Sequence, residues 1–150
     1  MSKVVKGMVP LVFALLCGAC KEYKDIAVDI SGGEIVFLLP QLPGLGTLYV
    51  EGLDTERDAF ESVWSISFAS GSATVQRITY GKAPTGTKVD VMYDPVQLKT
   101  GVLYTVSMDV GPIVAKGIFL IEGSGAERKI KNLTYQEANE FREQSRRKKT

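Results

Sequence analysis

The stretch of sequence that decides the fold is Leu98-Lys99-Thr100-Gly101-Val102-Leu103-Tyr104-Thr105-Val106. From Tyr104 to Val110 every second residue is large and apolar, which is typical of a β-strand with one buried face. Gly111-Pro112 then predicts a turn, and the apolar residues from 115 to 121 predict a returning strand. The simplest pairing of these two strands is an antiparallel hairpin.

Upstream of this hairpin the chain contains further short strand patterns separated by Gly and Pro. They lie at residues 26–30, 35–39, 48–51, 64–68, 75–80 and 89–91. Trp64, Ile66 and Phe68 alternate with serines, so we expect them in the core on one face of a strand. No long helical period interrupts these strands, which favours a mainly β sandwich over an α/β fold.

The spacing of Leu98, Gly101 and Tyr104 resembles the E–F corner of fibronectin type III and other immunoglobulin-like sandwiches. The resemblance implies that the ring of Tyr104 packs inward and that its hydroxyl returns to the backbone a few residues upstream. Residues 26–121 also have a length of 96, close to the roughly 100 of an immunoglobulin-like domain. Together with residues 78–86, the corner is similar to small, mostly uncharacterised bacterial lipoproteins of this architecture, a resemblance that implies no catalytic activity.

The N-terminus has the order of a secretory signal. Lys3 and Lys6 are followed by an apolar run from Met8 to Leu16, and small residues follow at Gly18 and Ala19. Nine residues would span about 14 Å as a helix, against about 30 Å of hydrocarbon, so this run is too short to cross a bilayer stably. The alternative is a buried helix of a cytosolic protein, which a proline within the run disfavours.

Residues Leu16-Cys17-Gly18-Ala19-Cys20 resemble the lipobox of bacterial lipoproteins, although Leu stands four residues before Cys20 and Cys17 takes the usual Leu position. The resemblance implies that residues 1–19 are removed and that Cys20 is lipidated. A single acyl chain binds membranes with an association constant of only about 10⁴ M⁻¹, so the two or three chains of this family anchor firmly. Lys21 in place of the family's Asp retention signal implies sorting to the periplasmic face of the outer membrane.

We expect four segments after the signal: a lipidated tether at residues 20–25, the sandwich at 26–121, a linker at 122–133 and a basic helical tail at 134–150. In the tail, Thr134 and Glu137 have the spacing of a capping box, which predicts a helix from about Tyr135 to Gln144.

Charge is segregated along the chain. Residues 20–126 contain eight basic and thirteen acidic residues, a net charge of −5, whereas residues 127–150 contain eight basic and four acidic residues, a net charge of +4. Near anionic headgroups each Lys or Arg contributes about 1 kcal/mol. The candidate residues for such a contact are Arg146, Arg147, Lys148 and Lys149. The alternative is a disordered, solubilising terminus.

Composition excludes several activities. The whole chain has 18 basic and 17 acidic residues, so bulk charge gives no reason to expect a nucleic-acid partner. Histidine is absent, which removes the commonest metal ligand and general base. Counted from Asp54, the acidic stretch 51–61 has Ala59 and Ser65 where an EF-hand needs Gly and Glu. We therefore expect no catalytic residues, no metal and no cofactor.

These observations predict a non-enzymatic, lipid-anchored envelope protein whose sandwich binds a protein or cell-wall partner. One alternative is a periplasmic inhibitor or immunity lipoprotein that neutralises a secreted toxin, suggested by the small size, acidic body and anchor. A third is an envelope hydrolase with paired carboxylates or Ser and Lys, for which the sequence offers no positive sign.

Overall fold

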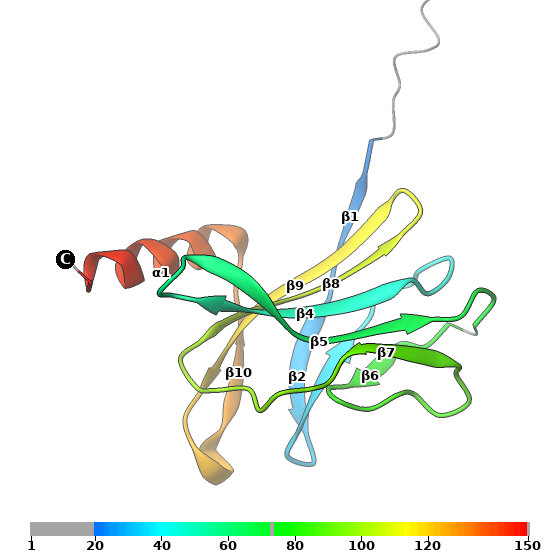
Figure 1. Ribbon diagram of the computed structural model, residues 1–150, viewed down its shortest axis with the longest axis horizontal. Coiled ribbons are helices and arrows are strands. Elements are labelled where there is room, and N and C mark those ends of the chain that lie inside the picture. Colours follow the sequence, from blue (N-terminus) through cyan, green and yellow to red (C-terminus); the bar gives the residue numbers. More distant parts are fainter. Residues whose placement is uncertain (1–19, 73, 150) are drawn as a thin grey trace, which may run out of the picture.

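The computed structural model describes residues 20–72 and 74–149, so the predicted signal segment 1–19 lies outside the described residues. The described part is mainly β, with two sheets and a C-terminal helix (Figure 1). Its elements are β1 (Glu22–Asp25), β2 (Ala27–Ser31), β3 (Glu34–Leu38), β4 (Thr47–Asp54), β5 (Ala59–Phe68), β6 (Arg77–Thr79), β7 (Val89–Tyr93), β8 (Leu103–Val110), β9 (Ile113–Glu122), a 3-10 helix (Gly125–Glu127), β10 (Lys129–Asn132) and α1 (Tyr135–Arg147).

The larger sheet has the strand order β1-β9-β8-β4-β5-β7, and β10 also pairs with β9. Strands β8 and β9 form the antiparallel hairpin predicted from residues 104–121, with Val110 opposite Ile113. β1 and β10 share one edge of β9, where β1 pairs with residues 113–116 and β10 with residues 119–122.

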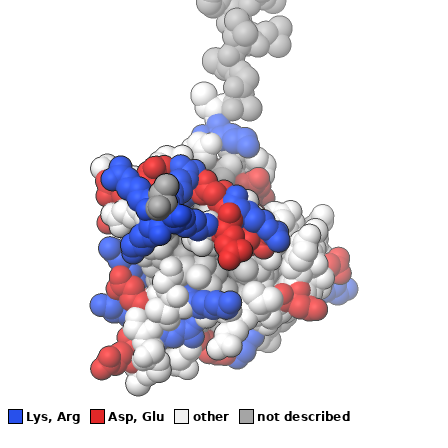
Figure 2. Space-filling model, turned by 60° about the vertical axis from the view of Figure 1, so that its left-hand side comes forward, with Lys and Arg blue, Asp and Glu red and all other residues white. Residues whose placement is uncertain are grey.

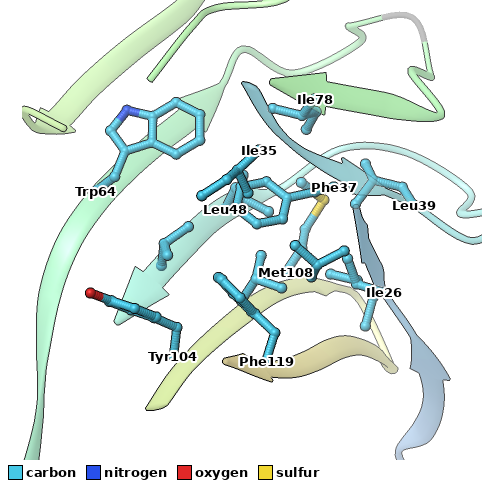
Figure 3. Packing of buried hydrophobic residues seen from close by; sticks show 14 of the residues in the cluster. Ile26, Ile35, Phe37, Leu39, Leu48, Trp64, Ile78, Tyr104, Met108 and Phe119 are labelled. Atoms are coloured by element: carbon cyan, nitrogen blue, oxygen red, sulfur yellow. The ribbon is translucent and has the colours of Figure 1, made fainter. Parts of the chain in front are cut away.

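The smaller sheet has the order β2-β3-β6 and packs on the larger one in a β-sandwich-like arrangement. Phe37 of β3 lies in the centre of the shared core, with its ring centroid 6.4 Å from Trp64 and 6.1 Å from Phe119 (Figure 3). Trp64, Ile66 and Phe68 are all buried, which confirms that this alternating stretch belongs to the core.

The tether predicted at residues 20–25 is wrong for its greater part, because Glu22–Asp25 form β1 and pair in parallel with β9. The chain then leaves the large sheet at Ile26 and continues into the small sheet as β2. At this crossing it runs so close to Gly117 that a Cβ there would lie 2.3 Å from the carbonyl oxygen of Ile26. The crossing therefore requires glycine at position 117.

The prediction of a linker at residues 122–133 is also wrong for the greater part, because most of these residues form secondary structure. This segment contains the 3-10 helix and β10. The side chain of Asn132 makes two hydrogen bonds to the backbone of Val28. Its Oδ1 accepts from the amide nitrogen over 2.9 Å, and its Nδ2 donates to the carbonyl oxygen over 2.8 Å. The local sequence Lys129-Ile130-Lys131-Asn132 is too polar to predict a strand, but the exposed edge of β9 supplies its pairing partner.

Helix α1 begins where the sequence predicts, with Thr134 as N-cap and a capping box with Glu137. It extends to Arg147, three residues beyond the predicted end. Ala138 and Phe141 pack on an apolar strip of the outer face of the large sheet. The strip contains Leu53, Leu103 and Leu120, with Phe60, Ile118 and Leu133 at its margin.

Candidate functional site

The expected lipidation residue, Cys20, is exposed and is the first described residue. Only Lys21 separates it from β1, whose first amide, at Glu22, donates to the carbonyl oxygen of Pro112 over 2.9 Å. Two residues of extended chain span about 7 Å. A group attached to the Cys20 sulfur would therefore be held close to the edge of the sheet and to the β8–β9 turn.

The corner residues predicted from sequence lie in one turn, in which Leu98 and Tyr104 are buried and Gly101 is exposed. The hydroxyl of Tyr104 accepts a hydrogen bond from the backbone N–H of Lys99 at 2.7 Å, and the tyrosine ring stacks on Phe119 with centroids 5.4 Å apart. Leu98 is buried, and Gly101 has a φ of 77°, which favours glycine. Burial raises the pKa of the Tyr104 hydroxyl, so the group stays neutral. It stabilises the turn as the acceptor for the Lys99 N–H.

A partly buried tyrosine, Tyr80, which sequence analysis did not single out, lies beside Trp64. The hydroxyl of Tyr80 donates to the carbonyl oxygen of Val96 at 2.7 Å, and its ring meets Trp64 edge-on at 5.2 Å. Burial raises the pKa of Tyr80 to about 12. Tyr80 thereby ties the segment that follows β7 to the core, and nothing in the local sequence marks this long-range bond.

An ion cluster joins the C-terminal half of α1 to the turn between β4 and β5. Asp58 accepts from Arg142 at 3.1 Å and from the Nε of Arg146 at 3.0 Å. The hydrogen bonds from Arg146 and then Arg142 lower the pKa of the Asp58 carboxyl. The Arg142 guanidinium also lies over the Phe60 ring, 5.5 Å from its centroid. The cluster fixes the end of α1 against the body.

The structure gathers the predicted basic residues at the end of α1 but gives them different surroundings. Arg146 contacts Asp58 and Glu143, and the Nζ of Lys149 donates to the carbonyl oxygen of Thr55. Arg147 and Lys148 are exposed. Figure 2 shows Lys and Arg side chains crowded around this end of the helix. The predicted residues therefore lie together at one end of α1, where Arg146 also pairs with the carboxylates of Asp58 and Glu143.

An exposed apolar stretch lies on and just after β7. The side chains of Val91, Met92, Tyr93 and Val96 are each more than half exposed. β7 is the last strand in the order of the large sheet, so among the described residues one of its edges has no partner strand. Such an edge offers free backbone groups to another strand. The alternation at Val89 and Val91 predicts a strand but does not show that it lies at an edge.

A shallow groove of about 510 Å³ lies where the chain crosses from β1 to β2. It is lined by residues of the crossing and of β9, among them Ile26, Gly117 and Ile118, and by Leu133 and the exposed Tyr135. Its lining is largely apolar, and its titratable side chains are those of Asp25, Lys116 and Tyr135.

The acidic stretch 51–61 is spread along the β4–β5 hairpin. The Asp54 carboxylate accepts the backbone N–H of Glu56 at 2.8 Å, and Glu61 pairs with Arg57. In residues 20–72 and 74–149 there is no group of three or more His, Cys, Asp or Glu side chains that could hold a metal ion. Across the same residues, no helix has the length and hydropathy needed to span a membrane.

No family model, no curated protein and no solved structure matches the chain. Its function is therefore inferred from the N-terminal sequence and from the surfaces described above.

Proposed function

We propose that the chain is a lipid-anchored bacterial envelope protein that acts as a non-enzymatic binding module. Acyl chains on Cys20 would hold it at the periplasmic face of the outer membrane. The observation that carries this proposal is the N-terminal order of positive residues, a short apolar run and a cysteine preceded by small residues.

The position of Cys20 relative to the fold supports this proposal. Among the described residues the first strand, β1, begins at Glu22, close to the expected cleavage point between residues 19 and 20. Cys20 itself is exposed and enters no core cluster, so lipid on its sulfur would displace no packed side chain. Processing at this position would leave every described strand and α1 intact.

We further propose that the sandwich is immunoglobulin-like. In that fold one sheet carries strands in the order C-F-G, and the other contains A, B and E. The sequence β4-β8-β9 in the large sheet and β2-β3-β6 in the small sheet supports this correspondence. The tyrosine at the start of β8 supports it as well, because its hydroxyl bonds to the backbone five residues upstream. The additional β5 and β7 extend the large sheet beyond strand C.

The partner proposed here is an extended segment of another envelope protein that pairs with β7. Exposed strand edges bind such segments by adding a strand to the sheet, and neighbouring apolar side chains provide specificity. β7 and β1 lie at opposite edges of the large sheet. A partner on β7 would therefore leave the lipid-anchored edge unobstructed.

The decisive experiment measures the mass of the protein extracted from bacterial membranes. The wild-type chain should begin at Cys20 and carry the added mass of its acyl chains. Cys20→Ser should prevent acylation, whereas the matched control Cys17→Ser should be acylated normally. Recovery of an uncut, soluble polypeptide that retains Met1 would contradict the proposal.

A periplasmic inhibitor of a secreted toxin is the second candidate, favoured by the net charge of −5 on residues 20–126. An acidic surface attracts a basic partner and accelerates association at low salt. A partner whose association rate falls steeply with salt and whose activity is blocked on binding would support this candidate. Salt-independent pairing that Val91→Lys abolishes would instead support strand addition at β7.

A further inference from the structure

We propose that the β7 edge pairs with β7 of a second copy of this chain, in an antiparallel contact centred on Val89. The contact runs from Thr87 to Val91 in each copy and places Lys88 of one copy opposite Asp90 of the other. It uses the edge that the proposed function assigns to a partner segment, and it states what covers that edge when the segment is absent. It does not depend on the lipid anchor.

The backbone of β7 turns free hydrogen-bonding groups toward the open edge of the large sheet (Figure 1). The amide nitrogen of Ala69, at the end of β5, donates to the carbonyl oxygen of Lys88 over 3.0 Å, so the backbone of Lys88 faces β5. Hydrogen-bonding directions alternate along an antiparallel strand, so the N–H and C=O groups of Val89 and Val91 face away from β5. These groups are available to a second strand.

The regular part of this edge is short. Its pairing register with β5 skips Met92, which marks a β-bulge immediately after Val91. On the other side, the N–H of Thr87 already donates to the carbonyl oxygen of Pro84 over 3.3 Å. A second strand therefore finds a regular edge only between Thr87 and Val91.

The charges on this short edge are complementary to themselves. Lys88 and Asp90 are both exposed, and because they are two residues apart on an extended strand they lie on the same face. Among residues 20–72 and 74–149 neither of them has an ion-pair partner. When two copies align antiparallel with Val89 opposite Val89, each lysine lies opposite the aspartate of the other copy. Opposite charges directly across a strand pair are stabilising.

The same features disfavour the neighbouring registers. An alignment centred on Asp90 would place two carboxylates directly opposite each other, which is destabilising. An alignment centred on Val91 would carry the pairing through the bulge at Met92. The charge pattern and the bulge together select the register centred on Val89.

The contact also covers apolar surface. Val91 is more than half exposed, and in this register it lies beside Thr87 of the second copy. Five residues from each copy form a small interface, so we expect monomers in dilute solution and dimers at high concentration. A paired edge cannot accept another strand. The extended partner segment must therefore displace the second copy before it binds.

The first experiment uses the full chain with Cys17→Ser and Cys20→Ser, which removes the expected lipid and both native thiols, in a non-ionic detergent. Sedimentation equilibrium measures the dissociation constant of the dimer. Lys88→Asp or Asp90→Lys alone should raise this constant at least about tenfold, because each reversal creates two like-charge pairs. The double variant restores two opposite-charge pairs and should return the constant to about its original value. Equal circular dichroism spectra establish that all variants are folded.

A second experiment measures the register by disulfide formation in the same chain. Val89→Cys should form a disulfide-linked dimer on mild oxidation, because hydrogen-bonded opposite residues have Cα atoms about 5.5 Å apart. Val91→Cys is the matched control. Its two copies would be displaced by four residues, or about 13 Å along the strand. That distance exceeds the limit of about 7 Å between the Cα atoms of a disulfide.

A monomeric chain at its highest soluble concentration would overturn the inference. A dimer that tolerates either single charge reversal, or that is linked by Cys at position 91 and not at position 89, would overturn it as well. Failure of the proposed anchor leaves these results unchanged, because the tested chain carries no lipid. Failure of the dimer leaves the β7 edge open for the proposed partner segment and does not affect the mass of the membrane-extracted protein.

Discussion

At the scale of single residues, several polar side chains of this protein form hydrogen bonds or ion pairs that connect separate segments of the chain. Tyr104 bonds to Lys99 across the turn, Asn132 bonds to Val28 across 104 positions, and Asp58 holds two arginines of α1. Each of these bonds links a loop or an edge to the core. Their loss should therefore reduce the free energy of unfolding.

Tyr104→Phe removes the acceptor for the Lys99 N–H and keeps the ring that stacks on Phe119. A part-buried donor is left unpaired, so we expect the free energy of unfolding to fall by about 1–2 kcal/mol. Urea denaturation measures this change. Tyr93→Phe is the matched control, because Tyr93 is more than half exposed, and it should leave the unfolding midpoint unchanged. Equal effects of the two substitutions would contradict a structural role for the Tyr104 hydroxyl.

The Asp58 cluster predicts a dependence on pH. The pKa of Asp58 is lower in the folded protein than in the unfolded chain, so its contribution is present above the unfolded value of about 4 and disappears as pH falls through the folded value. Urea unfolding at a series of pH values should show wild type more stable than Asp58→Asn at neutral pH. The two should converge in acid.

Asparagine is a suitable replacement at position 58, because the φ of Asp58 is 51° and both residues tolerate this left-handed conformation. Asp90→Asn on β7 provides the control, since the described residues give Asp90 no ion-pair partner. A stability gap for Asp58→Asn that stays constant down to strongly acidic pH would show that the arginine contacts are not its cause.

At the scale of secondary-structure elements, the sequence predicts strands better than their partners. Alternation at residues 104–110 and 64–68 is a local property, and both stretches are strands with the expected buried face. β1 and β10 have no such alternation and exist because β9 offers them an edge. Pairing of this kind depends on residues about ninety positions away in the case of β1, so a local pattern could not predict it.

The crossing between β1 and β2 gives a sharp test of this arrangement. Gly117→Ala places a methyl group against the carbonyl of Ile26, and a backbone atom cannot move aside cheaply. We expect a loss of about 1–3 kcal/mol or more in the free energy of unfolding, the range for overpacking. Gly44→Ala is the matched control, since its added Cβ would meet only Val110 at an ordinary 3.8 Å. Thermal unfolding that shifts equally for both would refute the close crossing.

At the scale of the whole molecule, the C-terminal segment is a part of the sandwich and not an appendage. β10 completes the outer edge of β9, Asn132 reaches β2 in the other sheet, and α1 covers apolar residues of the large sheet. The charge segregation along the sequence therefore does not mark a domain boundary. It places a basic helix on a body whose own net charge is negative.

Truncation of the full chain at two points tests this integration. Ending it after Leu133 removes α1, whereas ending it after Glu127 also removes β10 and the two bonds from Asn132. Because each lost hydrogen bond costs about 1 kcal/mol, the shorter chain should be at least about 2 kcal/mol less stable than the longer one. Urea unfolding compares the two proteins directly. Equal stabilities would mean that residues 128–133 act as the linker expected from their composition.

The sequence by itself determined the strand-rich character, the buried face of the 64–68 strand, the β8–β9 hairpin and the start of α1 at its capping box. These features depend on contacts within a few residues, through side-chain alternation, turn residues and helix capping. Only the tertiary structure decided that residues 22–25 and 129–132 are strands, that β7 is an exposed edge and that Asp58 holds Arg142 and Arg146. Each of these features depends on whether a segment distant in sequence supplies a hydrogen-bond partner. A local sequence pattern does not contain that information.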